Sequence, residues 1–238
     1  FASIRLCSSG GDKIPAELAH EFEALTGLQI NEQYGMSEIG IATINPVNGS
    51  NKIGSVGRAI SSYQMVIRGV DDAPLPPGSP GRLWVKSPCN MTGYWDDPKA
   101  TAATIKDGWL DTGDVMQQDE DGYFWFCGRQ KQIIVHDGSN ISPQEVEDAL
   151  MQHQAVALAG VVGVRDTVHG ENVRAYVTLK EIANPPADAE LIAFARARVG
   201  YKAPQDVFFL DHMPMNATGK IDRERLKKMS EEYSGSTE

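Results

Sequence analysis

The feature that most constrains the fold is a change of hydrophobic pattern along the chain. Residues 1–53 mix strand-like and helix-like runs, residues 54–125 are short β-like runs between turns, and helices alternate with strands after residue 128. The short polar stretch 128–132 separates the last two patterns. The sequence therefore predicts an α/β plus α+β fold in two domains, residues 1–128 and 129–238.

The first region predicts a strand, a helix and a second strand. Residues 3–7 look like a strand, and residues 14–25 have one apolar stripe that predicts a helix ending at Gly27. Residues 28–33 predict a strand with Tyr34 at its carboxyl end. Because ligand sites of α/β sheets gather at such ends, we expect a site there.

The middle region predicts an antiparallel barrel or a set of hairpins. Its β-like runs are 63–68, 81–86 and 122–126, and a Pro- and Gly-rich turn at 72–78 separates the first two.

The last region predicts a small α+β domain. Residues 142–145 (SPQE) form a capping box, with Val146, Ala149 and Leu150 as the buried face of the helix that follows. Asp188 and Asp222 are predicted caps of two more helices. Three strands are predicted, at 156–164, 173–179 and 207–210, and the tail 234–238 is expected to fray.

Composition limits the class of protein. The formal net charge of −10 argues against nucleic acid or an anionic membrane as the main partner. No apolar run approaches the roughly 20 residues that span a bilayer, and no signal peptide is recognised. Three cysteines without zinc or redox spacing fit a reducing, cytoplasmic setting, and five scattered histidines form no metal signature. The chain does not begin with Met, so we expect a piece of a longer protein.

Several short motifs have residue types suited to nucleotide chemistry. In residues 34–38 (YGMSE), the aromatic ring of Tyr34 can face a base, Ser37 can donate to a phosphate, and Glu38 offers a hard oxygen to Mg²⁺. The turn at Gly10 and Gly11 can lie against a planar base. Each also fits an ordinary turn or a strand-to-helix connection.

Four more side chains fit the same chemistry. Asp114, expected on a tight turn, can accept from two ribose hydroxyls, although capping a turn is the commoner role. Arg129 can bind a nucleotide or form a surface ion pair. Lys131 lies where a backbone rotation would move one half of the chain relative to the other. Lys220, on a glycine-containing loop, suits an anionic site or plain solvation.

In this order and spacing, the motifs resemble those of the adenylate-forming superfamily of acyl- and aryl-CoA synthetases, luciferases and carrier-loading adenylation domains. Landmarks at 91–98, 108–114, 128–131, 140–147, 201–204 and 216–220 extend the resemblance over nearly the whole chain. It implies that residues 1–128 end a large adenylation domain, comprising a sheet edge and a β-barrel region. Residues 129–238 would then be a small mobile domain with the catalytic lysine.

The resemblance also implies residue roles. Gly10, Gly11 and Tyr34 would border adenine, Ser37 would touch phosphate, and Glu38 would hold Mg²⁺. Asp114 and Arg129 would bind ribose, Lys131 would be the hinge, and Lys220 would bridge the carboxylate and the α-phosphate. Gly138 would lie near the thiol of coenzyme A, and the acyl-pocket wall would include Gly35, Ile41 and Ala42.

The implied reaction uses ATP, Mg²⁺ and coenzyme A to convert a fatty or aromatic acid into its thioester, with AMP released. The chain departs from the family in lacking the upstream phosphate loop, so we expect these residues alone to be inactive. Residues 137–139 (DGS) also replace a Gly-Gly pair. A carrier-protein thiol as acceptor, a luciferase-like oxygenase, a non-catalytic nucleotide-binding fragment and a homodimer stay open.

Overall fold

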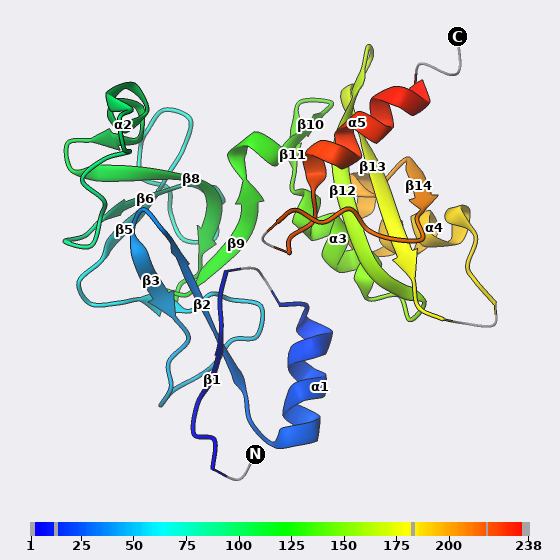
Figure 1. Cartoon of the computed structure of the whole chain (residues 1–238). Coiled ribbons are helices and arrows are strands. Elements are labelled where there is room, and N and C mark those ends of the chain that lie inside the picture. Colours follow the sequence, from blue (N-terminus) through cyan, green and yellow to red (C-terminus); the bar gives the residue numbers. More distant parts are fainter. Residues whose placement is uncertain (1–2, 12–13, 182–183, 218, 235–238) are drawn as a thin grey trace. The chain divides into compact units, whose positions relative to one another are not determined.

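A computed structural model describes residues 3–11, 14–181, 184–217 and 219–234. The chain divides into two compact units, Phe1–Gln130 and Lys131–Glu238 (Figure 1). Each unit has its own hydrophobic core, and the mixed α/β architecture expected from the sequence is confirmed. Among the described residues, no helix is long and apolar enough to cross a membrane.

The first unit begins with a four-stranded sheet in the order β1-β2-β3-β4. Strand β1 runs parallel to β2, and the other neighbours are antiparallel. The elements are β1 (Cys7–Ser9), helix α1 (Ala16–Thr26), β2 (Ile30–Met36), β3 (Gly40–Ile44) and β4 (Arg58–Ala59). Helix α1 ends where Gly27 takes a left-handed φ of 71°, as the sequence predicted.

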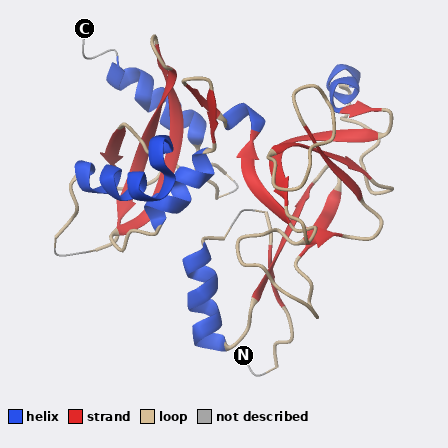
Figure 2. Cartoon of the chain, turned by 180° about the vertical axis from the view of Figure 1, so that it is seen from behind, coloured by secondary structure: helices blue, strands red, loops and turns tan. Residues whose placement is uncertain are grey.

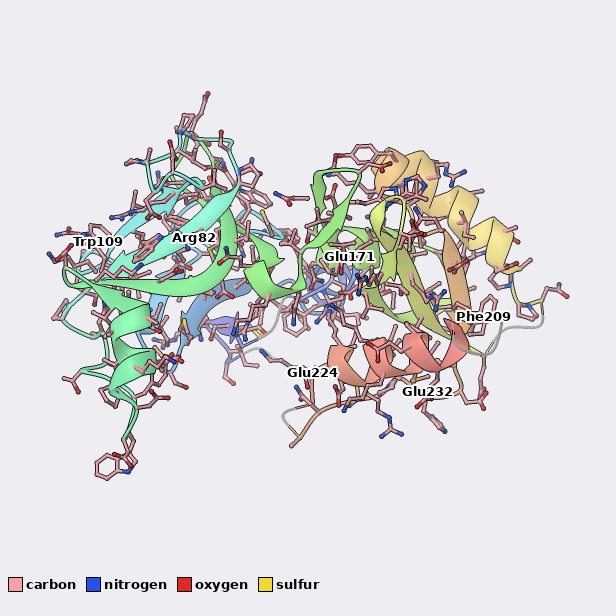
Figure 3. The ribbon with its side chains drawn as sticks, turned by 90° about the horizontal axis from the view of Figure 1, so that it is seen from above. Arg82, Trp109, Glu171, Phe209, Glu224 and Glu232 are labelled. Atoms are coloured by element: carbon pink, nitrogen blue, oxygen red, sulfur yellow. The ribbon has the colours of Figure 1, made fainter. Side chains whose placement is uncertain are left out.

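A five-stranded antiparallel sheet completes the first unit, and short helix α2 (Pro98–Thr104) precedes β7. The order β5-β6-β8-β7 is joined by β9, which also pairs with β8. The strands are β5 (Gln64–Arg68), β6 (Gly81–Lys86), β7 (Ile105–Lys106), β8 (Trp109–Gln118) and β9 (Phe124–Arg129). Arg82 on β6 and Trp109 on β8 mark this sheet in Figure 3.

The second unit is a five-stranded sheet with helices on both faces. Its strands are β10 (Ile134–His136), β11 (Ser139–Ile141), β12 (Val156–Asp166), β13 (Gly170–Leu179) and β14 (Asp206–Phe209). Its helices are α3 (Pro143–Met151), α4 (Asp188–Val199) and α5 (Arg223–Ser234), with 3₁₀ turns η1 (Gln130–Gln132) and η2 (Gly200–Lys202). The path β11-β10-β13-β12 is extended by β14 beside β13.

Strand alternation divides the second unit's core between the two faces of its sheet. Val161 and Ala175 pack with α3 and α4 in one cluster, whereas Val162 and Tyr176 pack with Leu226 of α5 in another. Helices lie in front of this sheet when it is seen from behind (Figure 2), and α5 lies on the near side in Figure 1.

Capping at the helix starts was predicted with mixed success. Ser142 caps α3 through the Glu145 N–H, and Asp222 accepts from the Arg225 N–H at 3.0 Å, as expected. The Asp188 prediction was wrong, because Ala187 is the N-cap of α4 and Asp188 is its first helical residue. Residues 235–238 of the predicted frayed tail lie outside the described residues.

The strand predictions were wrong mainly in where the strands begin and end. The first strand is at Cys7–Ser9 and not at 3–7, and the second runs to Met36, so Tyr34 lies inside β2 instead of at its end. Pairing with β3 prolongs β2 through a bulge after Tyr34. Asp114 lies within the long strand β8, where a turn had been expected, although Gly113 beside it has a φ of 70°.

Candidate functional site

A shallow cavity of about 280 Å³ in the first unit collects several predicted residues. It is lined by Gly10, Gly11, Gln33, Gly35, Met36, Gly40 and Ile41. The parallel pairing of β1 with β2 brings Gly10, just after β1, beside Gln33. A cavity walled mostly by glycine backbone can accept a flat group at close range.

Alternation along β2 explains which residues face the cavity. Gln33 and Gly35 line it, whereas Tyr34 between them points into the core and is only 9% exposed. A Cβ on Gly35 would lie 2.3 Å from the Gly40 carbonyl oxygen, so the bulged β2–β3 hairpin needs glycine at this position. Close backbone packing at Gly35 therefore shapes the cavity floor.

Tyr34 joins the first motif to the Asp114 motif. Its hydroxyl donates to Asp114 Oδ2 at 2.7 Å, and the Asp114 residue is 2% exposed. Arg129, paired with Asp114 across β8 and β9, places its Nε 3.3 Å from Asp114 Oδ1 while its side chain stays 59% exposed. Burial, the charge of Asp114 and this hydrogen bond raise the pKa of Tyr34 far above its usual value, so the phenol remains a donor.

Ser37 and Glu38 form the tip of the β2–β3 hairpin. The Ile39 N–H donates to the Met36 carbonyl at 3.1 Å and closes the turn around them. Ser37 is exposed, whereas Glu38 is half-buried and its Oε1 accepts from the Tyr94 hydroxyl at 3.1 Å. Partial burial and this bond raise the pKa of Tyr94. The Met91 N–H donates to the Glu38 carbonyl at 2.7 Å, which fixes the turn to the loop before α2.

Lys220 lies in a tight loop of the second unit. The Asn216 side chain accepts from the Lys220 N–H at 3.0 Å, and the Asn216 N–H donates to the Lys220 carbonyl at 2.8 Å. Gly219 takes a φ of 78°, which lets the chain reverse before Ile221 pairs with Met215. The loop therefore fixes the backbone from which the lysine side chain extends.

The remaining predicted residues lie at the start of the second unit. Lys131 is exposed in the 3₁₀ turn η1, at the first position of this unit. Gly138 is exposed at the tip of the β10–β11 hairpin.

The structure thus groups the predicted residues into four places. Four residues line the cavity: Gly10, Gly11, Gly35 and Ile41. Tyr34 and Asp114 are buried and hydrogen-bonded, and the exposed side chain of Arg129 pairs with Asp114. Ser37 and Glu38 share the hairpin tip, and the second unit contains Lys131, Gly138 and Lys220. Ala42 is 0% exposed in the core and does not line the cavity.

Sequence reasoning missed four residues at these places. Gln33, Met36 and Gly40 line the cavity, and Tyr94 contacts Glu38. The alternation of β2 would have indicated Gln33, because it shares a strand face with Gly35. Nothing local to Tyr94 indicates its partner, which lies 56 positions away.

Comparisons with known protein families assign both units to one group. The family described as AMP-binding enzyme matches residues 1–95, and the AMP-binding enzyme C-terminal domain matches residues 145–220. These matches include the cavity and hairpin residues of the first unit and Lys220 of the second.

Individual relatives agree with that assignment. A long-chain-fatty-acid–CoA ligase of Bacillus subtilis is 42% identical over 229 residues, covering 95% of this chain and 41% of the relative. ATP-bound MatB from Rhodopseudomonas palustris has a TM-score of 0.89 at 31% identity, and a benzoate CoA ligase from Burkholderia xenovorans has 0.85 at 33%. Both alignments cover 94% of this chain, and 45% and 46% of those chains.

The chain therefore spans less than half the length of these relatives. Over that span, motifs, fold and sequence agree. The chain belongs to the adenylate-forming superfamily of AMP-binding enzymes.

Proposed function

We propose that the protein is an ATP-dependent, AMP-forming acid–CoA ligase. It joins a fatty or aromatic carboxylate to AMP and then transfers the acyl group to the thiol of coenzyme A. The observation that carries the proposal is the Tyr34–Asp114 hydrogen bond, which links the two nucleotide motifs beside a cavity walled by glycines. The fatty-acid and benzoate ligases among the relatives support these acid classes.

In this proposal the first unit holds the nucleotide. The Gly10–Gly11 backbone and Tyr34 would border adenine, while Asp114 and Arg129 would bind ribose hydroxyls. The Asp114 carboxylate suits that role because Tyr34 holds it by a hydrogen bond and the Arg129 guanidinium lies beside it. An acceptor that is already fixed loses little entropy on binding. Gly35 and Ile41 would form part of the acyl-pocket wall, whereas Ala42 would support that wall from the core.

Ser37 and Glu38 fit a phosphate and its magnesium ion. A half-exposed carboxylate at a hairpin tip is a hard oxygen ligand of the kind Mg²⁺ prefers, and Ser37 offers a hydroxyl beside it. Glu38 would hold Mg²⁺, which would neutralise phosphate charge when bound. Tyr94 would keep the Glu38 carboxylate oriented through its 3.1 Å hydrogen bond.

The second unit would contribute to both half-reactions. Lys220 would bridge the carboxylate and the α-phosphate during adenylation, because an ammonium group can stabilise charge that develops there. The turn at Gly138 would lie near the thiol of coenzyme A during thioester formation. Lys131 would be the hinge that allows one unit to serve both steps in turn.

The test is a product assay on the full-length protein that carries these residues. Purified enzyme is mixed with ATP, Mg²⁺, coenzyme A and a panel of fatty and aromatic acids, and pyrophosphate, AMP and thioester are quantified. The proposal expects all three products from at least one acid, in equal amounts. The Glu38→Gln substitution should lower the rate of product formation and raise the Mg²⁺ concentration needed for half of the maximal rate.

Other outcomes would contradict the proposal. An acyl-adenylate that reacts with a carrier-protein thiol, but not with coenzyme A, would make the protein a carrier-loading enzyme. Tight nucleotide binding without pyrophosphate release from any acid would make it a non-catalytic nucleotide-binding protein.

A further inference from the structure

Two turns of the second unit bring His136, Asp137 and His169 together. One turn joins β10 to β11 and the other joins β12 to β13. Each of the three residues offers one ligand atom, and these atoms all lie within 4.8 Å of one another. We propose that this cluster, the His-Asp-His site, binds a divalent transition metal ion of the zinc class.

The β10–β11 turn holds Asp137 in a defined position. Asp137 and Gly138 have φ values of 48° and 74°, the pair of left-handed residues that a tight two-residue hairpin requires. The hairpin is closed by the pairing of His136 with Ser139. The Asp137 N–H also donates to the His169 carbonyl at 2.9 Å, which ties this turn to the second one.

The β12–β13 turn positions His169. Asp166 Oδ1 accepts from the backbone N–H groups of His169 and Val168, both at 2.8 Å. The His169 ring then places its Nδ1 2.8 Å from Asp137 Oδ1. Both turns therefore direct their side chains to one point without help from a ligand.

The hydrogen bonding of His136 leaves the nitrogen that a metal needs. Its Nδ1 lies 2.6 Å from the carbonyl oxygen of Glu171, which can only accept, so Nδ1 carries the hydrogen. In the neutral ring the Nε2 lone pair is then available, 3.7 Å from Asp137 Oδ2. Histidines that bind metals usually donate their other N–H to a carbonyl or carboxylate in this way. Glu171, labelled in Figure 3, lies at the start of β13.

The donor set and spacing suit zinc. Two imidazole nitrogens with one carboxylate oxygen are ligands that zinc takes in sites with an open fourth position. Ligand atoms of a tetrahedral zinc ion lie about 3.3 Å apart, given Zn–N distances of about 2.0–2.1 Å. His169 Nδ1 lies 2.8 Å from Asp137 Oδ1, and His136 Nε2 lies 3.7 Å from Asp137 Oδ2. All three ligand atoms lie within 4.8 Å of one another, so side-chain rotations would bring them onto one ion.

The test uses the untagged full-length protein that carries these residues, stripped of metal and kept reduced. Zn²⁺ is titrated by calorimetry, and Co²⁺ is added separately because its visible absorption reports tetrahedral coordination. We expect one ion per chain, and we expect His136→Ala, His169→Ala and Asp137→Asn each to weaken binding at least tenfold, in line with losses of about 10–100-fold for supporting residues alone. Asparagine tolerates the left-handed φ of residue 137, so the turn is preserved.

The matched control is His212→Ala, which removes an exposed histidine elsewhere in the same unit and should leave the affinity unchanged. Circular dichroism verifies folding of each variant. Equal binding by the wild-type chain and the His136→Ala/His169→Ala double variant would overturn the site. Loss of binding in Cys89→Ala alone would place the metal on an exposed thiol and would also overturn it. Either failure leaves the proposed ligase function intact, because no step of that function uses these three side chains.

Discussion

The Tyr34 hydroxyl donates to Asp114 Oδ2 at 2.7 Å across 80 positions of sequence. It is one of the contacts between the first and second sheets of the first unit, which also include the bridge of Arg58 with Tyr123. Since Asp114 is 2% exposed, its carboxylate oxygens depend on such partners for their hydrogen bonds in the core.

Removing the phenol oxygen with Tyr34→Phe should destabilise the chain. A hydrogen bond to a charged group contributes about 1.5–3 kcal/mol to stability, so a buried carboxylate that loses its donor should lower the free energy of unfolding by about that amount. The measurement is the free energy of unfolding in urea. Tyr63→Phe is the control, since it removes a 2.7 Å bond to the uncharged Ile39 carbonyl and should cost about 1 kcal/mol. Equal losses in the two variants would contradict a charge-assisted hydrogen bond between Tyr34 and Asp114.

Gly35→Ala should cost more stability than Gly10→Ala, although both residues line the cavity. The new Cβ at position 35 meets the Gly40 carbonyl oxygen at 2.3 Å, and backbone cannot move aside cheaply. At position 10 the nearest atom is Gln33 Cγ, at 2.7 Å, on a side chain that can rotate. Overpacking of this kind costs about 1–3 kcal/mol, so we expect position 35 near the top of that range. Unfolding midpoints that rank the two variants the other way would refute the packing argument.

The buried ion pair of Glu147 with Arg223 should show a pH-dependent effect. Arg223 donates to both carboxylate oxygens at 2.8 and 2.6 Å, and Val161 N–H donates to Glu147 at 2.7 Å. Burial raises the pKa of Glu147, while Arg223 and the Val161 N–H oppose that rise. A raised carboxyl pKa means that its contribution to stability is full below the unfolded pKa and is lost as pH rises through the folded pKa.

Arg223→Met removes the opposing charge and raises the Glu147 pKa further. The variant should therefore lose about 3 kcal/mol at neutral pH and less near pH 4, where Glu147 is protonated. Lys202→Met is the control, because it breaks a partly exposed pair with Glu145 and should cost under about 1 kcal/mol. Urea denaturation at both pH values measures the difference. A larger loss in acid than at neutral pH would be the wrong sign for this account.

In the full-length protein, Asp114→Asn should raise KM for ATP about tenfold or more. The change keeps the shape of the side chain but removes the charge that strengthens hydrogen bonds to ribose hydroxyls, a loss of about 1.5–3 kcal/mol. Steady-state kinetics separates this from a general loss of activity, since kcat should fall less than KM rises. Asp111→Asn, which alters a carboxylate paired with Arg82 at 3.2 Å, should leave KM unchanged. An unaltered KM in Asp114→Asn would remove Asp114 from the ribose site.

Much of the fold could be predicted because local signals were strong. Each of these signals lies within a few neighbouring residues. Examples are the strand at Gly81–Lys86, the N-cap at Ser142 and the helix end at Gly27. Strand β8 was missed because the Asp-Thr-Gly-Asp run within it looks like a turn. Its strand geometry comes from pairing with β6 and β9, which no local pattern reveals.

The site was predictable only in part, because its contacts join residues that lie far apart in the sequence. Motif order indicated Tyr34, Asp114 and Lys220, but the contact of Tyr34 with Asp114 and the depth of Asp114 depend on long-range packing. The histidines show the limit most clearly. His136 and His169 have no metal-ligand spacing in sequence, yet two turns bring their rings to a centroid separation of 5.1 Å.

We propose that Lys220 serves adenylation and not thioester formation, and single-turnover kinetics on the full-length protein tests this role most directly. One experiment follows adenylate formation from acid and ATP, and a second follows thioester formation from preformed acyl-adenylate and coenzyme A. Lys220→Ala should slow the first step by about 10²–10³-fold, the cost of removing one preorganised group that stabilises developing charge, and leave the second within a few-fold. Lys227→Ala, on an exposed position of α5, should alter neither step. Adenylation at the wild-type rate in Lys220→Ala, or equal slowing of both steps, would contradict the account.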